Sequence, residues 1–186
     1  LGGKFVLLDE MNGIARYVSR HGLDILAFSL PSLSGDIKSD LARRDFTINA
    51  MAMELGQLTT NSQLKLIDPF SGKEDLGNKT VRAVSDQTFE ADAVRLLRAV
   101  RLAAELDFAI EPETESLIRR YSQSIAKIPG ERVREELLRL LSLPRAAYWL
   151  RYLDQLGLLL ALIPELGESK GVEQPTVHFW DVFDHS

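Results

Sequence analysis

The N-terminal part of the chain alternates between apolar runs and turn-forming residues. Apolar runs rich in β-forming residues cover 4–8, 14–19 and 23–28. Asn12-Gly13 lies between the first two runs, and this dipeptide is a strong signal for a hairpin turn. The pattern predicts three short strands of an antiparallel sheet. Because three strands alone make a thin sheet, we expect more of it to lie upstream of the first residue.

The next segment mixes helical and extended patterns. Residues 34–44 place polar side chains along one surface and predict a helix, whereas 64–67 and 80–84 predict short strands. The apolar run over 48–55 is too short to be assigned from its period alone. Turns are predicted at Ser71-Gly72 and Gly77-Asn78.

From Phe89 onward the apolar positions repeat with the period of a helix. The pattern predicts four amphipathic helices, over 91–106, 112–126, 131–141 and 144–153. Pro164 and the glycines at 167 and 171 then predict a linker. Strands followed by segregated helices indicate an α+β fold that is mostly α, with a partial antiparallel sheet before a helical region.

Composition excludes several classes of protein. The chain of 186 residues has no cysteine, which rules out disulfides and thiolate metal sites and fits a cytoplasmic location. No apolar run reaches the roughly 18 residues of a membrane-spanning helix. The net charge of −5 is unfavourable for a non-specific nucleic-acid binder but leaves room for a local basic site. Leu1 and Ser186 are expected to be cuts within a longer protein, because neither end resembles a natural terminus.

The first cluster of candidate functional residues covers 40–50. It contains Arg43, Arg44, Asp45 and Asn49. Guanidinium groups bind phosphate with two parallel hydrogen bonds and stay charged at any working pH. The same residues also fit a solvated helix face, with Asp40 and Arg44 as an i, i+4 pair, and the pattern alone leaves both interpretations open.

The second cluster consists of Asp92, Arg95, Arg98 and Arg101, spaced by three residues. The arginines would form a cationic stripe suited to a triphosphate or an RNA backbone. A carboxylate beside a guanidinium also matches the pairing edge of cytosine or adenine, where an amine lies next to an acceptor. Alternatively, Asp92 caps a helix and the arginines pair with nearby glutamates such as Glu105.

Three further features are weaker. The charged residues over 131–139 are expected to form an outer helix face. The His and Asp residues over 178–185 have spacings that suit a metal, but an aromatic helix start explains them as well. Asp24, between apolar neighbours on a predicted strand, is either at the end of an edge strand or part of a metal site.

Four motifs together resemble one known family, the class II tRNA nucleotidyltransferases, which include CCA-adding enzymes and bacterial poly(A) polymerases. The motifs occur in the family's order within about the first 145 residues, and four in order are far more specific than one. They are Arg43-Arg44-Asp45-Phe46-Thr47-Ile48-Asn49-Ala50, Ile67-Asp68-Pro69-Phe70, the helix from Phe89 to Arg101, and Glu131-Arg132.

The resemblance implies a role for each candidate residue. Arg44 would contact the incoming nucleotide, and Asp45 and Asn49 would position its ribose. Asp92 and Arg95 would act as an amino-acid template for the base. Arg98 and Arg101 would hold the triphosphate or support the site. Asp24 matches the position of an accessory catalytic carboxylate.

The chain departs from the family pattern in two places. The residue before Asp92 is Ala91, where the family often has a second acid, with Glu90 one place earlier. The family's catalytic Asp-x-Asp pair does not occur in these 186 residues. We therefore expect the two Mg²⁺ ions to be bound mainly by residues upstream, no metal ligand within this chain, and no transferase activity from this fragment alone.

The resemblance also implies a division of the chain and its partners. Residues 1–84 would be the C-terminal part of a nucleotidyltransferase head domain, 85–145 a helical neck that selects the nucleotide and binds RNA, and 146–186 a helical body with the start of an HD-type domain. The substrates would be ATP and CTP, the partner an RNA, namely the tRNA 3′ end, with no membrane involved. The alternatives are a nucleotide- or RNA-binding fragment without catalysis and part of an HD-type metal phosphohydrolase.

Overall fold

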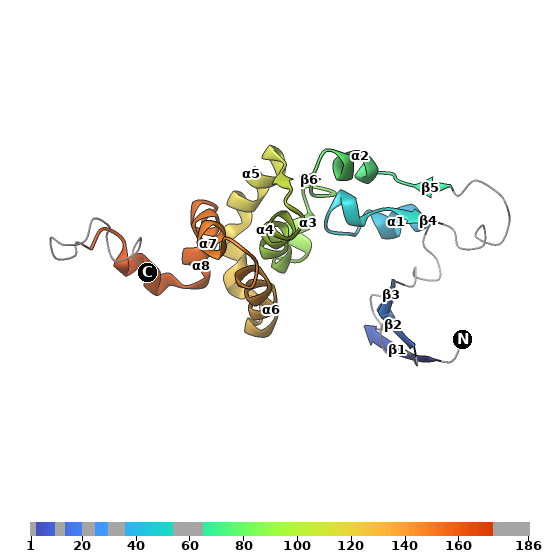
Figure 1. Cartoon of the computed structure of the whole chain (residues 1–186), viewed down its shortest axis with the longest axis horizontal. Helices are drawn as coiled ribbons and strands as arrows, with labels where there is room; N and C mark the ends of the chain where they lie inside the picture. Colours follow the sequence, from blue (N-terminus) through green and yellow to red (C-terminus); the bar gives the residue numbers. More distant parts are fainter. Residues whose placement is uncertain (1–2, 10–13, 20–24, 30–35, 54–64, 173–186) are drawn as a thin grey trace. The chain divides into compact units, whose positions relative to one another are not determined.

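The computed structural model describes residues 3–9, 14–19, 25–29, 36–53 and 65–172, the three N-terminal segments as backbone only. The chain divides into two compact units, Leu1–Arg43 and Arg44–Ser186 (Figure 1). The first unit contains a three-stranded sheet, and the second contains almost all of the helices. The α+β fold with mostly helical content is therefore confirmed.

The sheet of the first unit is an antiparallel meander. It is formed by β1 (Gly3–Asp9), β2 (Ile14–Ser19) and β3 (Ile25–Ser29), in the order β1-β2-β3. The register pairs Tyr17 of the central strand with Phe5 on one side and Leu26 on the other. All three strands lie where the apolar pattern predicted them.

A short helix follows in the same unit. Helix α1 (Ile37–Leu41) begins at Asp36, whose side chain accepts a hydrogen bond from the backbone N–H of Lys38 at 3.2 Å. The predicted helix over 34–44 was too long at its C-terminal end. There the backbone turns, and Phe46 of the second unit pairs with Ala83.

The second unit opens with short elements. They are η1 (Thr47–Asn49), β4 (Ala52–Met53), β5 (Leu66–Ile67), α2 (Gly72–Gly77) and β6 (Thr80–Val81). Strands β4 and β5 form an antiparallel pair. The strands predicted over 64–67 and 80–84 are thus present in shortened form, and the unassigned run over 48–55 supplies the end of η1 and all of β4.

Helix α2 lies where the sequence predicted only turns. Asp68 initiates it, because its carboxylate accepts the backbone N–H groups of Gly72 at 2.7 Å and Lys73 at 2.9 Å. These are donors that the first turn of a helix leaves without a partner. A Cβ at Gly72 would lie 2.1 Å from the carbonyl oxygen of Thr47, so glycine is what allows α2 to approach η1.

The helical part follows the predicted order with one interruption. Its elements are α3 (Thr88–Ala91), α4 (Val94–Leu106), β7 (Ala109–Ile110), α5 (Pro112–Tyr121), η3 (Ser122–Lys127), α6 (Gly130–Leu141), α7 (Ala146–Gln155), α8 (Leu158–Leu162) and η4 (Pro164–Ser169). The single helix predicted over 91–106 is wrong at its start, because the chain leaves helical geometry at Asp92. The linker predicted from Pro164 onward begins instead with η4, since Leu166 packs against the core.

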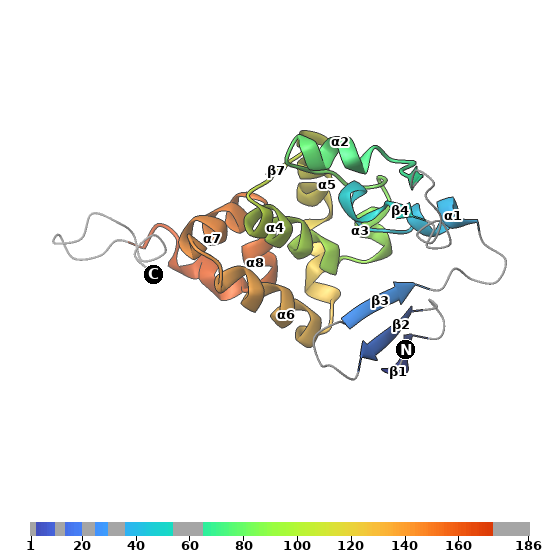
Figure 2. The same cartoon turned by 45° about the vertical axis from the view of Figure 1, so that its right-hand side comes forward.

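Helix α4 is at the centre of the core. Leu96, Leu97, Ala99 and Val100 are almost completely buried, and α6 and α7 pack against this helix (Figure 2). Strand β6 pairs in parallel with β7, which ties the segment before α3 to the segment after α4. Of the helices in the described part of the chain, none has the length and apolarity needed to cross a bilayer.

Candidate functional site

The site is built around the interruption between α3 and α4. Asp92 has an extended backbone, with φ −158° and ψ 104°, and its carboxylate accepts the backbone N–H of Val94 at 3.3 Å. In a continuous helix that N–H would bond to the carbonyl of residue 90. Aspartate side chains compete for backbone donors in this way, and the result here is that Asp92 lies at the start of α4.

Asp92 is also held by the N-terminal turn of α6. The guanidinium of Arg132 donates to both carboxylate oxygens, at 3.1 Å and 2.7 Å. This is the two-bond geometry typical of the strong arginine–carboxylate pairs. The sequence predicted Arg132 to belong to an outer charged face, and its contact with Asp92 was not foreseen.

Arg95 lies in the first turn of α4 and is half-buried. Its guanidinium donates to the backbone carbonyl of Thr88 at 3.3 Å. Burial lowers the pKa of Arg95, and the nearby carboxylates of Asp45 and Asp92 oppose this. Arg95 therefore lies near acidic residues of both predicted clusters, which the structure brings together.

Arg98 makes the direct link between those clusters. Its guanidinium contacts Asp45 at 3.1 Å and Glu136 of α6 at 2.8 Å. Asp45 in turn accepts from the side chain of Asn49 at 3.1 Å and from the backbone N–H of Phe46 at 2.8 Å. Burial raises the pKa of Asp45, but the hydrogen bonds from Asn49, Arg98 and Phe46 outweigh it, so the pKa lies below its ordinary value.

Arg101 has a different environment from the other two arginines. Its side chain is only 10% exposed and contacts Glu136 at 2.5 Å as well as Glu105. In the part of the chain that the structure describes, no buried side-chain nitrogen or oxygen lacks a hydrogen-bond partner. Of the two roles expected for Arg101, these contacts favour supporting the site over holding a triphosphate.

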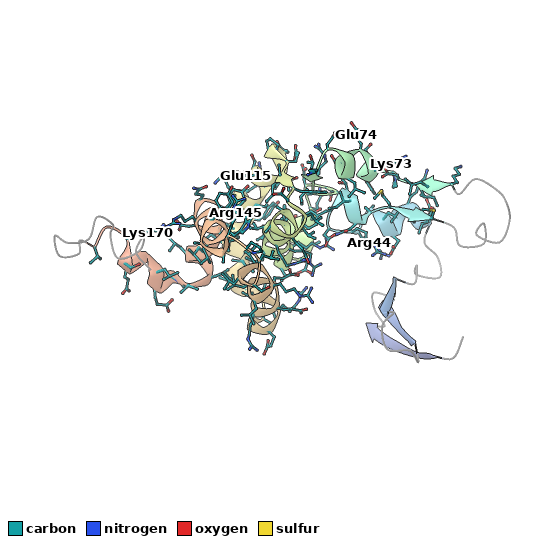
Figure 3. All side chains as sticks on the ribbon, in the orientation of Figure 1. Arg44, Lys73, Glu74, Glu115, Arg145 and Lys170 are labelled. Atoms are coloured by element: carbon teal, nitrogen blue, oxygen red, sulfur yellow. The ribbon has the colours of Figure 1, made fainter. Side chains whose placement is uncertain are left out.

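The remaining predicted residues are placed as follows. Arg44 is partly buried and is the first residue of the second unit. It lies on the side of that unit that carries α2, at the opposite end from Lys170 (Figure 3). Asp24 and the segment over 178–185 lie outside the described residues. Among the residues that are described, no group of three or more His, Asp or Glu side chains is arranged to hold a metal ion.

Glu136, which joins Arg98 to Arg101, was not predicted to belong to the site. Glu136 is buried, with 7% of its surface exposed. A signal was present, because Glu136 precedes the buried Leu140 by four residues and so shares its face of α6. The charged residues over 131–139 are thus not all on an outer face.

A second network, also not predicted, connects η1 to α5. The buried Asp75 accepts from the hydroxyl of Thr47 at 2.7 Å and from Arg82 at 3.1 Å. Arg82 also pairs with Glu111 at 3.2 Å, and Glu111 caps α5 by accepting from the backbone N–H of Thr114 at 2.7 Å. Thr47 of the motif over 43–50 is therefore anchored, through the buried Asp75 and through Arg82, to the half-buried Glu111.

Comparison with known proteins identifies the family. A model described as the poly(A) polymerase head domain matches residues 14–82, and a model described as the probable RNA and SrmB-binding site of polymerase A matches residues 107–169. The A-adding tRNA nucleotidyltransferase of Deinococcus radiodurans is 36% identical over all of this chain. The chain belongs to the class II tRNA nucleotidyltransferase family. The CC-adding tRNA nucleotidyltransferase of Geobacter sulfurreducens is 43% identical over 78% of the chain.

Solved structures of the family agree with this assignment. The chain matches a CCA-adding enzyme in complex with ATP with a TM-score of 0.76 at 33% identity, over 94% of this chain and 40% of that one. It matches the Thermotoga maritima CCA-adding enzyme in complex with tRNA with a TM-score of 0.75, over the same shares of the two chains. The chain spans 41% of the length of the Deinococcus relative and 32% of the Geobacter relative.

Proposed function

We propose that the full-length protein transfers nucleotides from CTP or ATP to the 3′ end of tRNA, with release of pyrophosphate. The 3′-oxygen of the RNA forms a bond to the α-phosphorus of the nucleotide. The bond from that phosphorus to the bridging oxygen breaks, and pyrophosphate leaves. The chain described here would supply the groups that select and orient the nucleotide.

One observation carries this proposal. Asp92 and Arg95 lie together at the start of α4, and Arg95 is close to the Asp45 carboxylate of the other motif. A carboxylate accepts from the exocyclic amine of cytosine or adenine, and a guanidinium donates to the neighbouring ring acceptor. Uracil and guanine present the opposite arrangement and would be rejected. Relatives solved with ATP and with CTP support this assignment.

The other predicted residues would orient the rest of the nucleotide. Arg44 would contact it, and Asp45 with Asn49 would position the ribose. Arg98 is already hydrogen-bonded to Asp45 and Glu136, so its charge is partly balanced and it can act on phosphate only together with these partners. Arg101 would keep α4 and α6 in register.

The described residues do not fit a Mg²⁺ site, because no cluster of three acidic or histidine side chains occurs among them. That the full-length enzyme uses Mg²⁺, that Asp24 is its accessory carboxylate, and that it is cytoplasmic stay predictions.

The relatives do not decide between the possible products. An A-adding enzyme, a CC-adding enzyme and a multifunctional CCA protein share 36%, 43% and 40% identity with the matched parts of this chain. The deciding experiment is nucleotide incorporation by the full-length protein on tRNA that lacks its 3′ end, with CTP and ATP offered separately and together. Ordered addition of C, C and A that then stops identifies a CCA-adding enzyme. Addition of C alone identifies a CC-adding enzyme, and addition of a single A identifies an A-adding enzyme. Open-ended addition of A identifies a poly(A) polymerase. The absence of any incorporation contradicts the proposal.

The base-selecting role has a separate test. In the full-length protein, Arg95→Ala should reduce the preference for CTP and ATP over UTP and GTP by about tenfold to a hundredfold, the range for one lost two-bond contact to a base. Exposed Arg139, which pairs along its own helix with Glu135, provides the matched control. A preference in Arg95→Ala equal to that of the wild type would contradict the role of Arg95 as part of the template.

A second candidate is a nucleotide- or RNA-binding module without catalysis, formed by these 186 residues alone. It is favoured by the presence of the base-selecting residues and by the lack of an Asp-x-Asp pair in this sequence. We expect the 186-residue chain to bind labelled ATP without incorporating it into RNA. Measurable incorporation would contradict this second candidate.

A further inference from the structure

We infer that Arg132 is a positioning residue that fixes the Asp92 carboxylate in the orientation that reads the base, and thereby sets base specificity. The inference rests on the proposed function, in which Asp92 and Arg95 are the template. Arg132 itself would not contact the base. It would act from α6, a helix that the template residues do not belong to.

The contact fixes the carboxylate plane. Two guanidinium nitrogens of Arg132 donate to the two oxygens of Asp92, at 3.1 Å and 2.7 Å, while the backbone N–H of Val94 donates to one of them at 3.3 Å. With both oxygens held from one side, the carboxylate has no freedom to rotate about its terminal bond. An ionised carboxylate offers about four acceptor positions, so an incoming amine still finds one.

Arg132 is itself held in place by the buried part of the same helix. Glu136 lies four residues later, on the same face of α6, and contacts Arg98 at 2.8 Å and Arg101 at 2.5 Å. Since both arginines belong to α4, the first turn of α6 has a fixed position relative to the start of α4. The guanidinium of Arg132 therefore meets Asp92 from a defined direction.

The pair is too exposed to serve mainly for stability. The side chain of Arg132 is 48% exposed and that of Asp92 is 24% exposed. Exposed ion pairs contribute little to folding because water screens them. A two-bond contact at an accessible carboxylate that is expected to bind a ligand is better explained by orientation of that carboxylate.

The geometry also predicts which substitution will not rescue function. Arginine presents a planar fork that matches a carboxylate, whereas lysine is a single point charge on a flexible stem. Arg132→Lys keeps the positive charge beside Asp92 but leaves the carboxylate free to rotate. We therefore expect lysine to preserve folding without restoring base choice.

The experiment measures kcat and KM for CTP, ATP, UTP and GTP with the full-length wild type and with Arg132→Ala, Arg132→Lys and Arg139→Ala. We expect Arg132→Ala and Arg132→Lys to lower the ratio of kcat/KM for CTP over UTP, and for ATP over GTP, by about tenfold. Arg139→Ala removes the same charge from the same helix and should leave both ratios unchanged. If Arg132→Ala fails to fold, Arg132→Lys alone carries the test.

A purely structural role would give a different result. It would lower the thermal stability and slow all four nucleotides equally, with unchanged ratios, and that outcome would overturn the inference. In an Asp92→Ala background, removal of Arg132 should cause no further loss of the ratios, because its partner is absent. An additional loss there would overturn it too.

Failure of the proposed function gives a third pattern. If the wild type incorporates no nucleotide, or if Asp92→Ala keeps the wild-type ratios, the template assignment is wrong and the inference falls with it. If Asp92→Ala loses the ratios while Arg132→Ala keeps them, the template stands and only the role of Arg132 is wrong.

Discussion

Among the guanidinium–carboxylate contacts that connect α6 to the region of α4, Arg101–Glu136 and Arg132–Asp92 differ mainly in solvent access. Glu136 and Arg101 have side chains that are only 8% and 10% exposed. Arg132, about one turn before Glu136 on α6, and its partner Asp92 have side chains that are 48% and 24% exposed. The inner contact fixes the packing of two helices, and the outer one leaves a carboxylate that a ligand can reach. The same chemistry thus supports the packing in one place, and in the other we propose that it serves recognition.

The physical reason is the cost of removing charge from water. A buried guanidinium that loses its partner keeps the full cost of desolvation, whereas an exposed one is re-solvated by water. Substitutions on the two contacts should therefore separate stability from specificity.

The largest effect is expected for Glu136→Ala. It leaves the buried Arg101 paired with Glu105 and removes one partner of Arg98, and such a loss costs about 3–5 kcal/mol. Glu135→Ala, which removes an exposed carboxylate on the same helix, should cost less than about 1 kcal/mol. Denaturant unfolding of both variants checks the difference. Equal losses would show that burial of the inner contact is not what matters.

The next effect tests close packing without any charge. Gly72→Ala places a Cβ 2.1 Å from the Thr47 carbonyl oxygen, so α2 must move away from η1. We expect a loss of about 1–3 kcal/mol, typical of overpacking, in thermal or denaturant unfolding. Gly77→Ala, at the other end of the same helix, has no atom within 4 Å of the added Cβ and serves as the control. A neutral Gly72→Ala would contradict the close approach of these elements.

A smaller, pH-dependent effect is expected at Asp45. Because its pKa in the folded protein lies below the ordinary value of 3.8, the stabilisation is complete above pH 3.8 and is lost as the pH falls through the folded pKa. Asp45→Asn lacks this contribution. The stability difference between wild type and Asp45→Asn, measured as the midpoint of thermal unfolding, should be constant near neutral pH and shrink below pH 3.8. A difference that grows on acidification would contradict the direction of the shift.

Much of the fold was foreseeable from the sequence, but not all of it. The three N-terminal strands and the helices α4 to α7 follow from apolar periodicity, because their apolar residues repeat with a regular spacing in the sequence. The interruption at Asp92 does not follow from periodicity, since the residues on both sides have helical patterns, although capping of a helix by Asp92 was one interpretation of the sequence. Helix α2 was missed for a similar reason, because Asp68 acts across an intervening turn.

The candidate site likewise contains residues that the sequence predicted and partners that it did not. Asp92, Arg95, Arg98 and Asp45 were selected as residues from their chemistry and from the family motifs. Their supporting partners on α6 lie 38 to 40 positions away along the chain from Arg98 and Asp92. Pairings over such distances depend on tertiary packing, which no local pattern encodes. The buried position of Glu136 was readable from the helical period, but the identity of its partners was not.

The smallest effect on stability is expected for Arg132→Ala. Its guanidinium is about half-exposed, so the loss should stay below about 1 kcal/mol in denaturant unfolding. Together with the loss of base preference, this result would place Arg132 in recognition and Glu136 in support. A loss as large as that of Glu136→Ala would remove the distinction between the two contacts.

The network from Thr47 to Glu111 has a consequence for protein engineering. Thr47, Asp75 and Arg82 precede the helical region, while Glu111 both binds Arg82 and begins α5. A chimaera that joins the first part of this chain to α5 and the following helices of an A-adding or CC-adding relative inherits the two halves of that network from different parents. Exchange points outside residues 82–111 keep Arg82 and Glu111 from the same parent and should therefore work better than exchange points between them.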